Sequence, residues 1–506
     1  MSLNGALGIA NGGLSNISIG LSVISQNVAN ASTPQYAVEA ATQTSLSAGG
    51  QGFGVQSGVV LRATDAALSA QLSGQIAQGA ANQTASTALS ALQPVLGTVG
   101  GGTDLGSQLV AMQSAFSALL GDPGDATQQG AAVASAQGLA MGINTLSGAY
   151  GQARQAAQDN LATGIGQLST ELGKMGLLSK QIISLRGQGQ STADLENQRA
   201  QAEQAISQLV DARFLDQPNG DAIVLSAGGV QLPTTGTPSL SIAGATTGPT
   251  LFYPGGGLPG IMLGTSDITA QMTGGSIGGN LALRDTTLPT YQGSLDEFAH
   301  ALSGRFADQG LTLFSDGTGK VPPGTGPAPQ AGYVGYSGAI QVNPAVTANP
   351  ALIRDGTQAV AGSPAGASAF TPNATGLAGF STMITRVLSF ALGSQAQAGV
   401  PQVPVTTGGL GPGGGLQAGF GAQATLLSYA DAQTASQAAD SASATGRTLD
   451  TQAVVTTLAS KLTGETGVSM DTELGHMVVL QQAYGANAKI ISAVEALFTE
   501  TLAMVT

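Results

Sequence analysis

The sequence predicts a mainly α-helical fold with inserted β structure. In it, terminal coiled-coil helices, a helical-bundle rod domain and a small antiparallel β outer domain form nested discontinuous domains. Apolar residues follow a heptad pattern at both ends of the chain, and helical spacing recurs through most of the interior. Between residues 214 and 275 the pattern changes to short apolar–polar alternations separated by Gly, Pro and Thr, which is typical of short strands.

The first heptad stripe lies in residues 3–30, where apolar side chains recur at alternating steps of four and three. Its large members are Leu3, Leu7, Leu14, Ile17, Leu21, Ile24 and Val28. Ser32, Thr33 and Pro34 are expected to end this helix, because the residue before a proline is pushed out of the helical region. Gly12 and Gly13 predict a soft point inside it.

The second heptad stripe lies in the last helix, which is expected from about residue 470 to the end of the chain. Its large members are Met477, Leu480, Tyr484, Ile491, Val494 and Phe498. Asn487 interrupts the stripe, and a polar group at such a position commonly fixes the register. Ser469 is expected to cap this helix, with Asp471 and Glu473 in its first turn at the positive end of the helix dipole.

Neither apolar stripe has neighbouring sequence that would cover it. We therefore expect the first and last segments to pair, and the pair to pack against other copies of the chain. The periodicity alone leaves an ordinary intramolecular helical bundle open as the alternative.

The interior elements follow in order along the chain. Residues 36–64 predict an extended loop with small strands, and helices are expected over residues 65–92, 104–120, 126–188 and 193–212. Short strands are expected at residues 222–225, 230–232, 240–242, 251–253 and 261–263. Helix returns over residues 281–309, 377–398 and 422–462, and strand-like pieces lie at residues 332–342.

The domains are expected to be nested, because helices both precede and follow the β segment. Residues 1–36 and 468–506 would form the inner terminal coiled-coil domain. Residues 37–213, 276–310 and 376–467 would form a helical rod-like domain, interrupted by a Gly/Pro linker at 399–419. Residues 214–275 would form the outer β domain, and residues 311–375 an irregular or β insertion.

Composition argues against several classes of function. Only 8% of the 506 residues are charged, and the net charge is −13 with 15 Lys and Arg residues, so nucleic-acid binding, which needs clustered cations, is not expected. The absence of Cys excludes disulfides and thiolate sites. No long apolar run predicts a membrane span. No Lys or Arg precedes Arg62, so the basic start of a cleaved signal peptide is missing.

The sequence predicts no catalytic, cofactor-binding or metal-binding residue, and hence no enzyme. The two histidines, His300 and His476, lack a second His at metal spacing, and each is expected on a helix in a packing or surface role. Asp296 and Glu297 are adjacent on a helix, so their side chains point in different directions and do not form an acid/base pair.

The stretch from residue 25 to residue 36 reads SQNVANASTPQY. It resembles the N-terminal motif of the bacterial flagellar axial proteins, the superfamily of rod, hook and hook-associated proteins. The matching residues are Asn27, Ala29, Asn30, Thr33 and Tyr36. Gln35 stands where the superfamily has Gly. If the superfamily needs a positive φ at that position, this chain is expected to turn differently.

The stretch from residue 481 to residue 492 reads QQAYGANAKIIS and is similar to the C-terminal helix of the same superfamily. Its motif residues are Gln482, Ala483, Ala486 and Ala488. The continuation VEALF at residues 494–498 favours the hook-associated members over the hook protein. Residues 278–285 (GGNLALRD) and 194–199 (DLENQR) also resemble these members, so the resemblance covers nearly the whole chain.

This resemblance implies a structural subunit of the bacterial flagellum at the junction between hook and filament, with no cofactor. It implies secretion through the flagellar type III export route without a cleaved signal peptide, and hence an extracellular place in the flagellum. The implied partners are further copies of the chain in a helical or ring assembly, the hook protein, a second hook–filament junction protein and an export chaperone. The alternatives are a hook or filament-type subunit and, from a different class, a low-charge surface adhesin.

Overall fold

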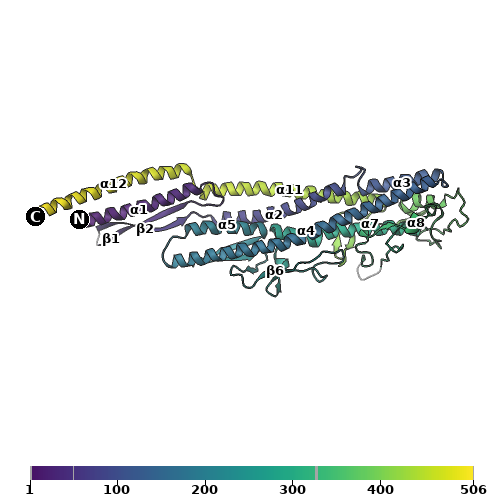
Figure 1. The fold of residues 1–506 in the computed structure, drawn as a ribbon, viewed down its shortest axis with the longest axis horizontal. Helices are drawn as coiled ribbons and strands as arrows, with labels where there is room; N and C mark the ends of the chain where they lie inside the picture. The colour runs from purple at the N-terminus through teal and green to yellow at the C-terminus, as the bar shows by residue number, and fades with distance from the viewer. Residues whose placement is uncertain (1–2, 49–50, 325–328, 505–506) are drawn as a thin grey trace.

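The computed structural model describes residues 3–48, 51–324 and 329–504. They form a long, narrow molecule in which both termini lie at one end and the long helices run roughly along the long axis (Figure 1). Helices carry most of the chain, and the strands form small antiparallel sheets. The predicted fold class, mainly α-helical with inserted β structure, is confirmed.

Two helices and a hairpin build the end of the molecule that carries the termini. The helices α1 (Leu3–Asn30) and α12 (Met470–Ala503) lie side by side and run in opposite directions (Figure 1). The strands β1 (Glu39–Ala48) and β2 (Gln51–Arg62) pair antiparallel, and their hairpin packs along α1. The extended loop predicted at residues 36–64 is therefore mostly one long two-stranded ribbon.

Long helices form the rod. They are α2 (Ala66–Leu96), α3 (Leu105–Gly121), α4 (Ala126–Gly187), α5 (Ala193–Leu209), α6 (Gly275–Ala282), α7 (Leu288–Asp308) and α11 (Leu426–Thr466). Three of them begin after an Asp whose carboxylate accepts the backbone N–H two or three residues further on: Asp65, Asp104 and Asp125. Helix α4 has 62 residues, which at 1.5 Å per residue makes it about 93 Å long.

Three hydrophobic cores lie in the described part of the rod: a small one between α2 and α11, and two larger ones that follow one another along the rod and both contain residues of α4. The core far from the termini contains a cluster of aromatic rings, in which Phe306 contacts Phe116 at 6.1 Å and Phe314 at 5.5 Å between ring centroids. The core nearer the termini packs Leu161 and Leu168 of α4 against α5, α6 and the small sheets. The length of α4 therefore ties the two halves of the rod together.

Two three-stranded antiparallel sheets pack against the rod helices. They comprise β3 (Ala212–Asp216), β4 (Ala222–Ser226) and β5 (Gln231–Leu232), and β6 (Leu240–Ile242), β7 (Ile261–Leu263) and β8 (Ser266–Asp267), followed by the 3₁₀ turn η1 (Thr269–Gln271). Val224 and Ile261 belong to the same core as Ile165 and Ile206 of the helices. The boundary predicted between the rod-like domain and the outer β domain, at residues 213 and 214, therefore passes through a single core.

The segment between α7 and α11 consists of short elements. They are β9 (Phe314–Ser315), η3 (Tyr336–Gly338), β10 (Gln341–Val342), α8 (Pro344–Ala348), α9 (Leu352–Asp355), α10 (Thr382–Arg386), η4 (Val387–Ala391), β11 (Gln395–Gln397), β12 (Val400–Pro401), β13 (Gly408–Leu410) and β14 (Leu416–Gln417). The helix predicted over 377–398 is wrong outside residues 382–391. The linker predicted at 399–419 contains paired strands, and Leu410 within it is fully buried.

Two further expectations differ from the structure. The strand expected at 251–253 is absent, and only isolated bridges involve Phe252. The helix expected from residue 281 begins at Gly275, because Gly274 and Gly275 adopt positive φ values of 64° and 60° that turn the chain into α6. A π-helical turn, η2 (Leu283–Thr287), then joins α6 to α7.

Within the described residues, α1 is the one helix that is long and apolar enough to cross a membrane by length and composition. In the structure it packs on α12 and on the hairpin. The expectation of no membrane span stays a prediction.

Candidate functional site

The paired terminal helices contact each other in a seven-residue register. The facing pairs are Gly13 with Asn487, Gly20 with Leu480, and Asn27 with Glu473. Each step of seven along α1 is thus matched by a step of seven in the opposite direction along α12. A Cβ placed on Gly20 would lie only 2.9 Å from Leu480 Cδ1, so the missing side chain permits the close approach. The soft point predicted at Gly12 and Gly13 lies in an unbroken helix, and Gly13 contacts Asn487.

The predicted stripe residues are mostly only half covered by this pairing. Ile17, Ile24 and Val494 are buried. The half-buried members are Leu3, Leu7, Leu14, Leu21, Val28, Met477, Leu480, Ile491 and Phe498. Tyr484 is 49% exposed, so the pairing with α1 leaves it largely uncovered, and its place in an interface with other copies stays a prediction. The helix pair therefore retains apolar surface.

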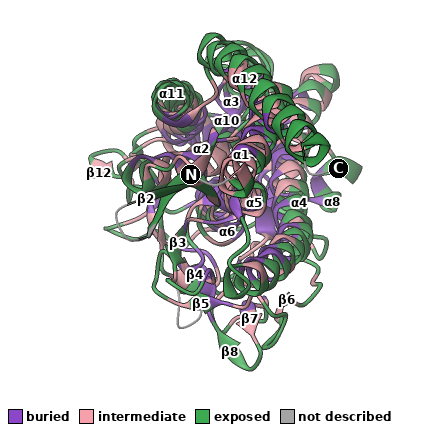
Figure 2. Cartoon of the chain, turned by 90° about the vertical axis from the view of Figure 1, so that its left-hand side faces the viewer, coloured by how far each residue is buried: buried purple, intermediate pink, exposed green. Residues whose placement is uncertain are grey.

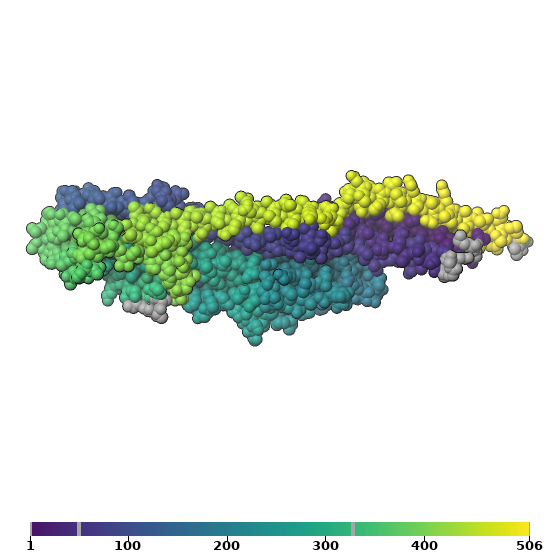
Figure 3. Space-filling model, turned by 180° about the vertical axis from the view of Figure 1, so that it is seen from behind, coloured from purple at the N-terminus to yellow at the C-terminus, as the bar shows by residue number. Residues whose placement is uncertain are grey.

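Helix α12 carries a second heptad seam that the sequence analysis missed. Its positions, at steps of four and three, are Val479, Ala483, Ala486, Ile490, Ala493 and Leu497. The three large members, Val479, Ile490 and Leu497, are 63%, 47% and 50% exposed. Figures 2 and 3 show most of the surface of α12 uncovered, with α1 beneath it. The seam was missed because half of its positions are Ala, although two of them, Ala483 and Ala486, had been identified as motif residues.

The outer face of α1 has a different chemistry. Apart from Gln26, its exposed positions also follow steps of four and three, and they are Asn4, Gly8, Asn11, Ser15, Ser18, Ser22, Ser25 and Ala29. The residues of this row are small and uncharged. Motif residue Ala29 thus lies on this outer face, whereas Gln482 and Ala488 lie on α12, exposed and half-buried respectively.

Motif residue Asn27 joins three segments through one fully buried amide. Its Nδ2 donates to Glu39 O at 2.8 Å and to Glu473 Oε2 at 3.2 Å. Its Oδ1 accepts from Glu39 N at 3.0 Å and from the Tyr36 hydroxyl at 3.1 Å. We call Asn27 with these three partners the Asn27 clasp, and it connects the end of α1, the start of the hairpin and the start of α12. Glu473, expected only as a helix-end charge, is buried here.

A second buried amide extends the contact to the rod. Asn197 of α5 accepts from Ala37 N at 3.0 Å through Oδ1, and its Nδ2 donates to Ala37 O at 3.1 Å and Glu39 Oε1 at 2.9 Å. Burial raises the pKa of Glu39 above its usual value, while the hydrogen bond from Asn197 acts in the opposite direction. Burial and the nearby Glu39 carboxylate also raise the pKa of Tyr36.

In the motif turn between α1 and the hairpin, a residue other than glycine adopts the left-handed backbone conformation. Gln35 has φ = 63°, the one positive φ at a non-glycine position among the described residues. The expectation that the chain turns differently here was therefore wrong: Gln35 adopts the conformation usually reserved for Gly. Upstream, the Thr33 hydroxyl donates to Asn30 Oδ1 at 3.3 Å and Tyr36 N to Thr33 O at 3.2 Å, so the other motif residues build the turn.

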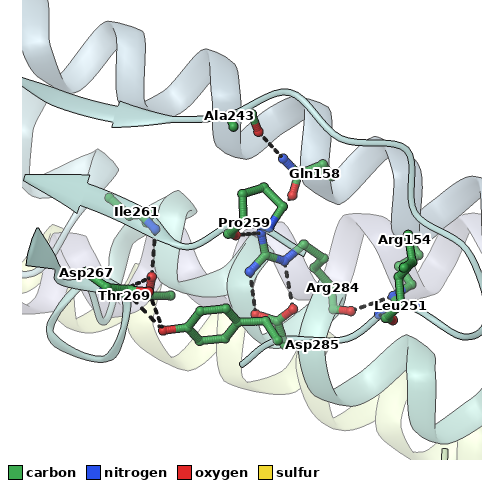
Figure 4. A network of polar contacts seen from close by, with 11 residues as sticks. Arg154, Gln158, Ala243, Leu251, Pro259, Ile261, Asp267, Thr269, Arg284 and Asp285 are labelled. Atoms are coloured by element: carbon green, nitrogen blue, oxygen red, sulfur yellow. Dashed lines mark hydrogen bonds and ion pairs between the residues drawn. The ribbon is translucent and has the colours of Figure 1, made fainter. Parts of the chain in front are cut away.

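The interior motif at residues 278–285 supplies a buried arginine (Figure 4). Arg284 has no exposed surface. Its Nε and Nη2 each donate to one carboxylate oxygen of Asp285 at 2.7 Å, and its Nη1 donates to Gln158 Oε1 at 2.7 Å and Pro259 O at 3.0 Å. The guanidinium thus holds together the π turn, α4 and the loop before β7.

Arg154, one turn before Gln158 on α4, fastens the same loop (Figure 4). It donates to Arg284 O at 2.8 Å, to Gly248 O at 2.9 Å and to Leu251 O at 2.7 Å. Nearby, Asp267 accepts from the Thr269 hydroxyl at 2.6 Å. These contacts attach the outer sheets rigidly to the rod.

The residues weighed for chemistry have packing roles. His300 stacks on Tyr333 with 3.9 Å between ring centroids, and its Nε2 lies 3.0 Å from Pro322 O. Asp296 accepts hydrogen bonds from the backbone N–H groups of Gly335 and Ser337, and Glu297 accepts one from the Tyr333 hydroxyl, so both carboxylates bind the same loop at residues 333–337. In the part of the chain that the structure describes, no group of three or more His, Asp or Glu could hold a metal ion.

Two family models of flagellar proteins match parts of the chain. The family model for the "Flagellar hook-associated protein FlgK helical domain" matches residues 89–320, from α2 to beyond α7. The family model for the "Flagellar basal body rod FlgEFG protein C-terminal" matches residues 465–504, which contain α12. No curated protein gives a significant match to the chain.

One solved structure similar to the chain is that of the flagellar hook junction protein FlgK from Burkholderia pseudomallei. The identity is 23% and the TM-score 0.41. The alignment covers 50% of this chain and 45% of the solved one, so the matched part spans less than half of that protein.

Proposed function

We propose that the chain is a FlgK-type flagellar hook-associated protein and a structural subunit of the junction between hook and filament. The observation that carries this proposal is the outward seam of α12. A subunit that joins further copies needs apolar helical surface that it does not cover itself. Val479, Ile490 and Leu497 supply such a surface.

Assembly would proceed by burying this seam against a neighbouring copy. Covering a side chain such as Ile490 or Leu497 contributes about 1.5–3 kcal/mol, and repetition along the helix offsets the cost of ordering it. The half-buried apolar side chains between α1 and α12 would become more fully covered at the same time. The outer face of α1, which is small, polar and uncharged, suits a wall along which unfolded chains pass during export.

The partners proposed on this basis are further copies of the chain, the hook protein, a second hook–filament junction protein and an export chaperone. We propose that the protein leaves the cell through the flagellar type III route and acts outside it without enzymatic activity. The carboxylates of Asp296 and Glu297 and the half-buried His300 are hydrogen-bonded within the chain, which supports a structural role.

The proposal is tested in a strain that lacks this protein. We expect hooks without filaments, with filament subunits released into the medium, and restoration by the wild-type chain. Normal filaments on such cells would contradict a junction role. Long polymers of the purified chain alone would favour a hook or filament-type subunit.

A further inference from the structure

A small cavity lies at the joint between the rod and the terminal unit, by which we mean α1, α12 and the β1–β2 hairpin. Its volume is about 50 Å³, which leaves room for water. The motif turn and the end of β2 form one side of it, and α2, α5 and the end of α11 form the others. Any separation of the terminal unit from the rod therefore opens this cavity to solvent.

Glu203 of α5 lines this cavity with a carboxylate that has no hydrogen bond. Arg199, one turn earlier on α5, places its Nε 3.6 Å from Glu203 Oε1, which is too long for a hydrogen bond. The other nitrogens of Arg199 are engaged elsewhere, with Asp216 Oδ1 at 2.7 Å and Gly220 O at 3.0 Å. Within residues 3–48, 51–324 and 329–504, no group donates a hydrogen bond to the Glu203 carboxylate.

Arg62 lines the same cavity from the hairpin side, and its hydrogen bonding is also incomplete. Its Nη1 donates to Glu196 O at 3.3 Å, while its Nε is buried without a partner in the described part of the chain. The closed joint thus removes a carboxylate and a guanidinium from bulk water and replaces few of the hydrogen bonds that water would give them.

The charged groups that act on Glu203 only partly offset its burial. Arg199 on the same helix and Arg62 on β2 lower its pKa, whereas Asp216 on β3 raises it. Burial outweighs these charges and raises the pKa of Glu203 to about 7 from an ordinary value of 4.5. The closed cavity therefore favours the neutral carboxyl, and solvent favours the ionised one.

The remaining walls of the cavity give the ionised carboxylate no new partner. Tyr36 of the motif turn donates its hydroxyl hydrogen to Asn27 Oδ1, and Asp65 caps α2 by accepting from Leu68 N at 2.9 Å. Helix α11 lines the cavity with uncharged side chains alone, namely Leu462, Thr463 and Thr466. An ionised Glu203 is therefore stabilised mainly by opening the cavity to water.

We propose that the proton on Glu203 controls this joint: the terminal unit stays seated on the rod while the Glu203 carboxyl is neutral, and it separates more easily once the carboxyl is ionised. A group that binds its proton more tightly in the closed joint than in the open one stabilises the closed joint at low pH. That contribution is lost as the pH rises through the pKa of the closed joint. The device belongs to the single chain and does not depend on the proposed assembly.

Two backbone hydrogen bonds across the joint report its opening. Ala37 N donates to Asn197 Oδ1 on α5 at 3.0 Å, and Val38 N donates to Thr466 O on α11 at 2.8 Å. Hydrogen–deuterium exchange of these two amides is measured on the purified full-length chain at pH 5.5 and pH 8 and corrected for the intrinsic exchange rate at each pH. We expect opening to increase at least about tenfold at the higher pH, within a ceiling of about 300-fold for the full pKa difference.

The variants Glu203→Gln and Glu203→Ala both remove the titrating group. In either variant we expect the corrected exchange of the two amides to change by less than about twofold between the two pH values, and to be slower at pH 8 than in the wild type. Glu495→Gln, at an exposed position of α12, is the matched control and should behave like the wild type.

Equal corrected exchange of the wild type at both pH values would overturn the proposal, and this measurement needs no variant. A pH dependence that the Glu203 variants retain would also overturn it, because the dependence would then belong to another group at the joint, such as Glu39, whose pKa is also raised by burial. Either result leaves the proposed junction role untouched, since the experiment follows the isolated chain.

Discussion

Asn27 of α1 donates a hydrogen bond to Glu473 of α12 across 3.2 Å, although 446 residues separate them in the chain. The same amide holds both backbone groups of Glu39. Because these groups are buried, breaking the contact would leave several polar atoms without partners. The polar contacts of one motif residue thus fix how the terminal helix pair meets the hairpin and the rod.

Replacing Asn27 by Ala should loosen the terminal helix pair. The backbone groups of Glu39 and the carboxylate of Glu473 lose partners, so we expect the docking of the pair to weaken by about 2 kcal/mol. Limited proteolysis between residues 31 and 38 should then become at least about tenfold faster. Ser25→Ala, at an exposed hydroxyl bonded only to Leu21 O, is the matched control. Equal cleavage of both variants would contradict the role of the Asn27 clasp.

Replacing Gln35 by Gly should stabilise the chain. A left-handed conformation costs a non-glycine residue about 1–2 kcal/mol, and the extra freedom of Gly in the unfolded chain returns part of this. We expect a gain of about 0.5–1 kcal/mol in the free energy of unfolding. Gln35→Ala should leave it nearly unchanged and Gln35→Val should lower it. Denaturant unfolding of the three variants gives their free energies of unfolding. A lower value for the Gly variant than for the wild type would contradict backbone strain at Gln35.

Replacing Arg284 by Met should destabilise the rod strongly. The Asp285 carboxylate would remain partly buried without its cation, and loss of one partner of a buried pair costs about 3–5 kcal/mol. Arg186→Met is the control, since the Arg186–Glu196 pair is more exposed and should change stability by less than about 1 kcal/mol. Thermal unfolding of both variants checks the difference. Similar melting temperatures of the two variants would show that the buried hydrogen bonds of Arg284 contribute little to the stability of the fold.

Asp296 should make stability depend on pH. Burial raises the pKa of Asp296 to about 6 from an ordinary value of 3.8. The folded chain therefore keeps a proton that the unfolded chain loses, so this group stabilises the fold below pH 4, and the contribution disappears as the pH rises through 6. The pKa difference corresponds to about 3 kcal/mol. Asp296→Asn should remove this slope from urea unfolding measured between pH 4 and pH 7.

The control for that experiment is Asp316→Asn. Hydrogen bonds from Thr318 lower the pKa of Asp316, so its contribution has the opposite sign and is lost as the pH falls through the lowered pKa. An Asp296→Asn variant with the same pH slope as the wild type would contradict the assignment.

Much of the terminal architecture could be predicted because large apolar residues at heptad spacing are direct evidence of helix pairing. Leu480 lies against Gly20 of α1 as expected, and Ile24 is buried. The second seam could not be found from hydrophobicity, because Ala483 and Ala486 have small side chains. The motif resemblance identified these two positions without a physical reason. In the structure both belong to the second heptad seam of α12.

Polar contacts and shared cores were harder to predict. The partner of Asn27 lies at the far end of the chain, and the sequence does not show that Glu473 points inward. Gln35 shows that a non-glycine residue can keep a left-handed turn when its surroundings require it. The segment 399–419 was predicted as a linker because it is rich in Gly and Pro. Its Leu410 is nevertheless buried and packs beside Gly293 of α7.

The outward seam of α12 is tested most directly by the double variant Ile490→Asp/Leu497→Asp, compared with Leu449→Asp on the exposed face of α11. The amount of each chain in isolated flagella is measured together with the thermal unfolding of the purified protein. We predict that the double variant unfolds like the wild type and is at least about tenfold depleted from flagella, because each charge left in an apolar contact costs several kcal/mol. The Leu449→Asp control should assemble normally. Incorporation of the double variant at the level of the control would contradict the assignment of this seam to assembly.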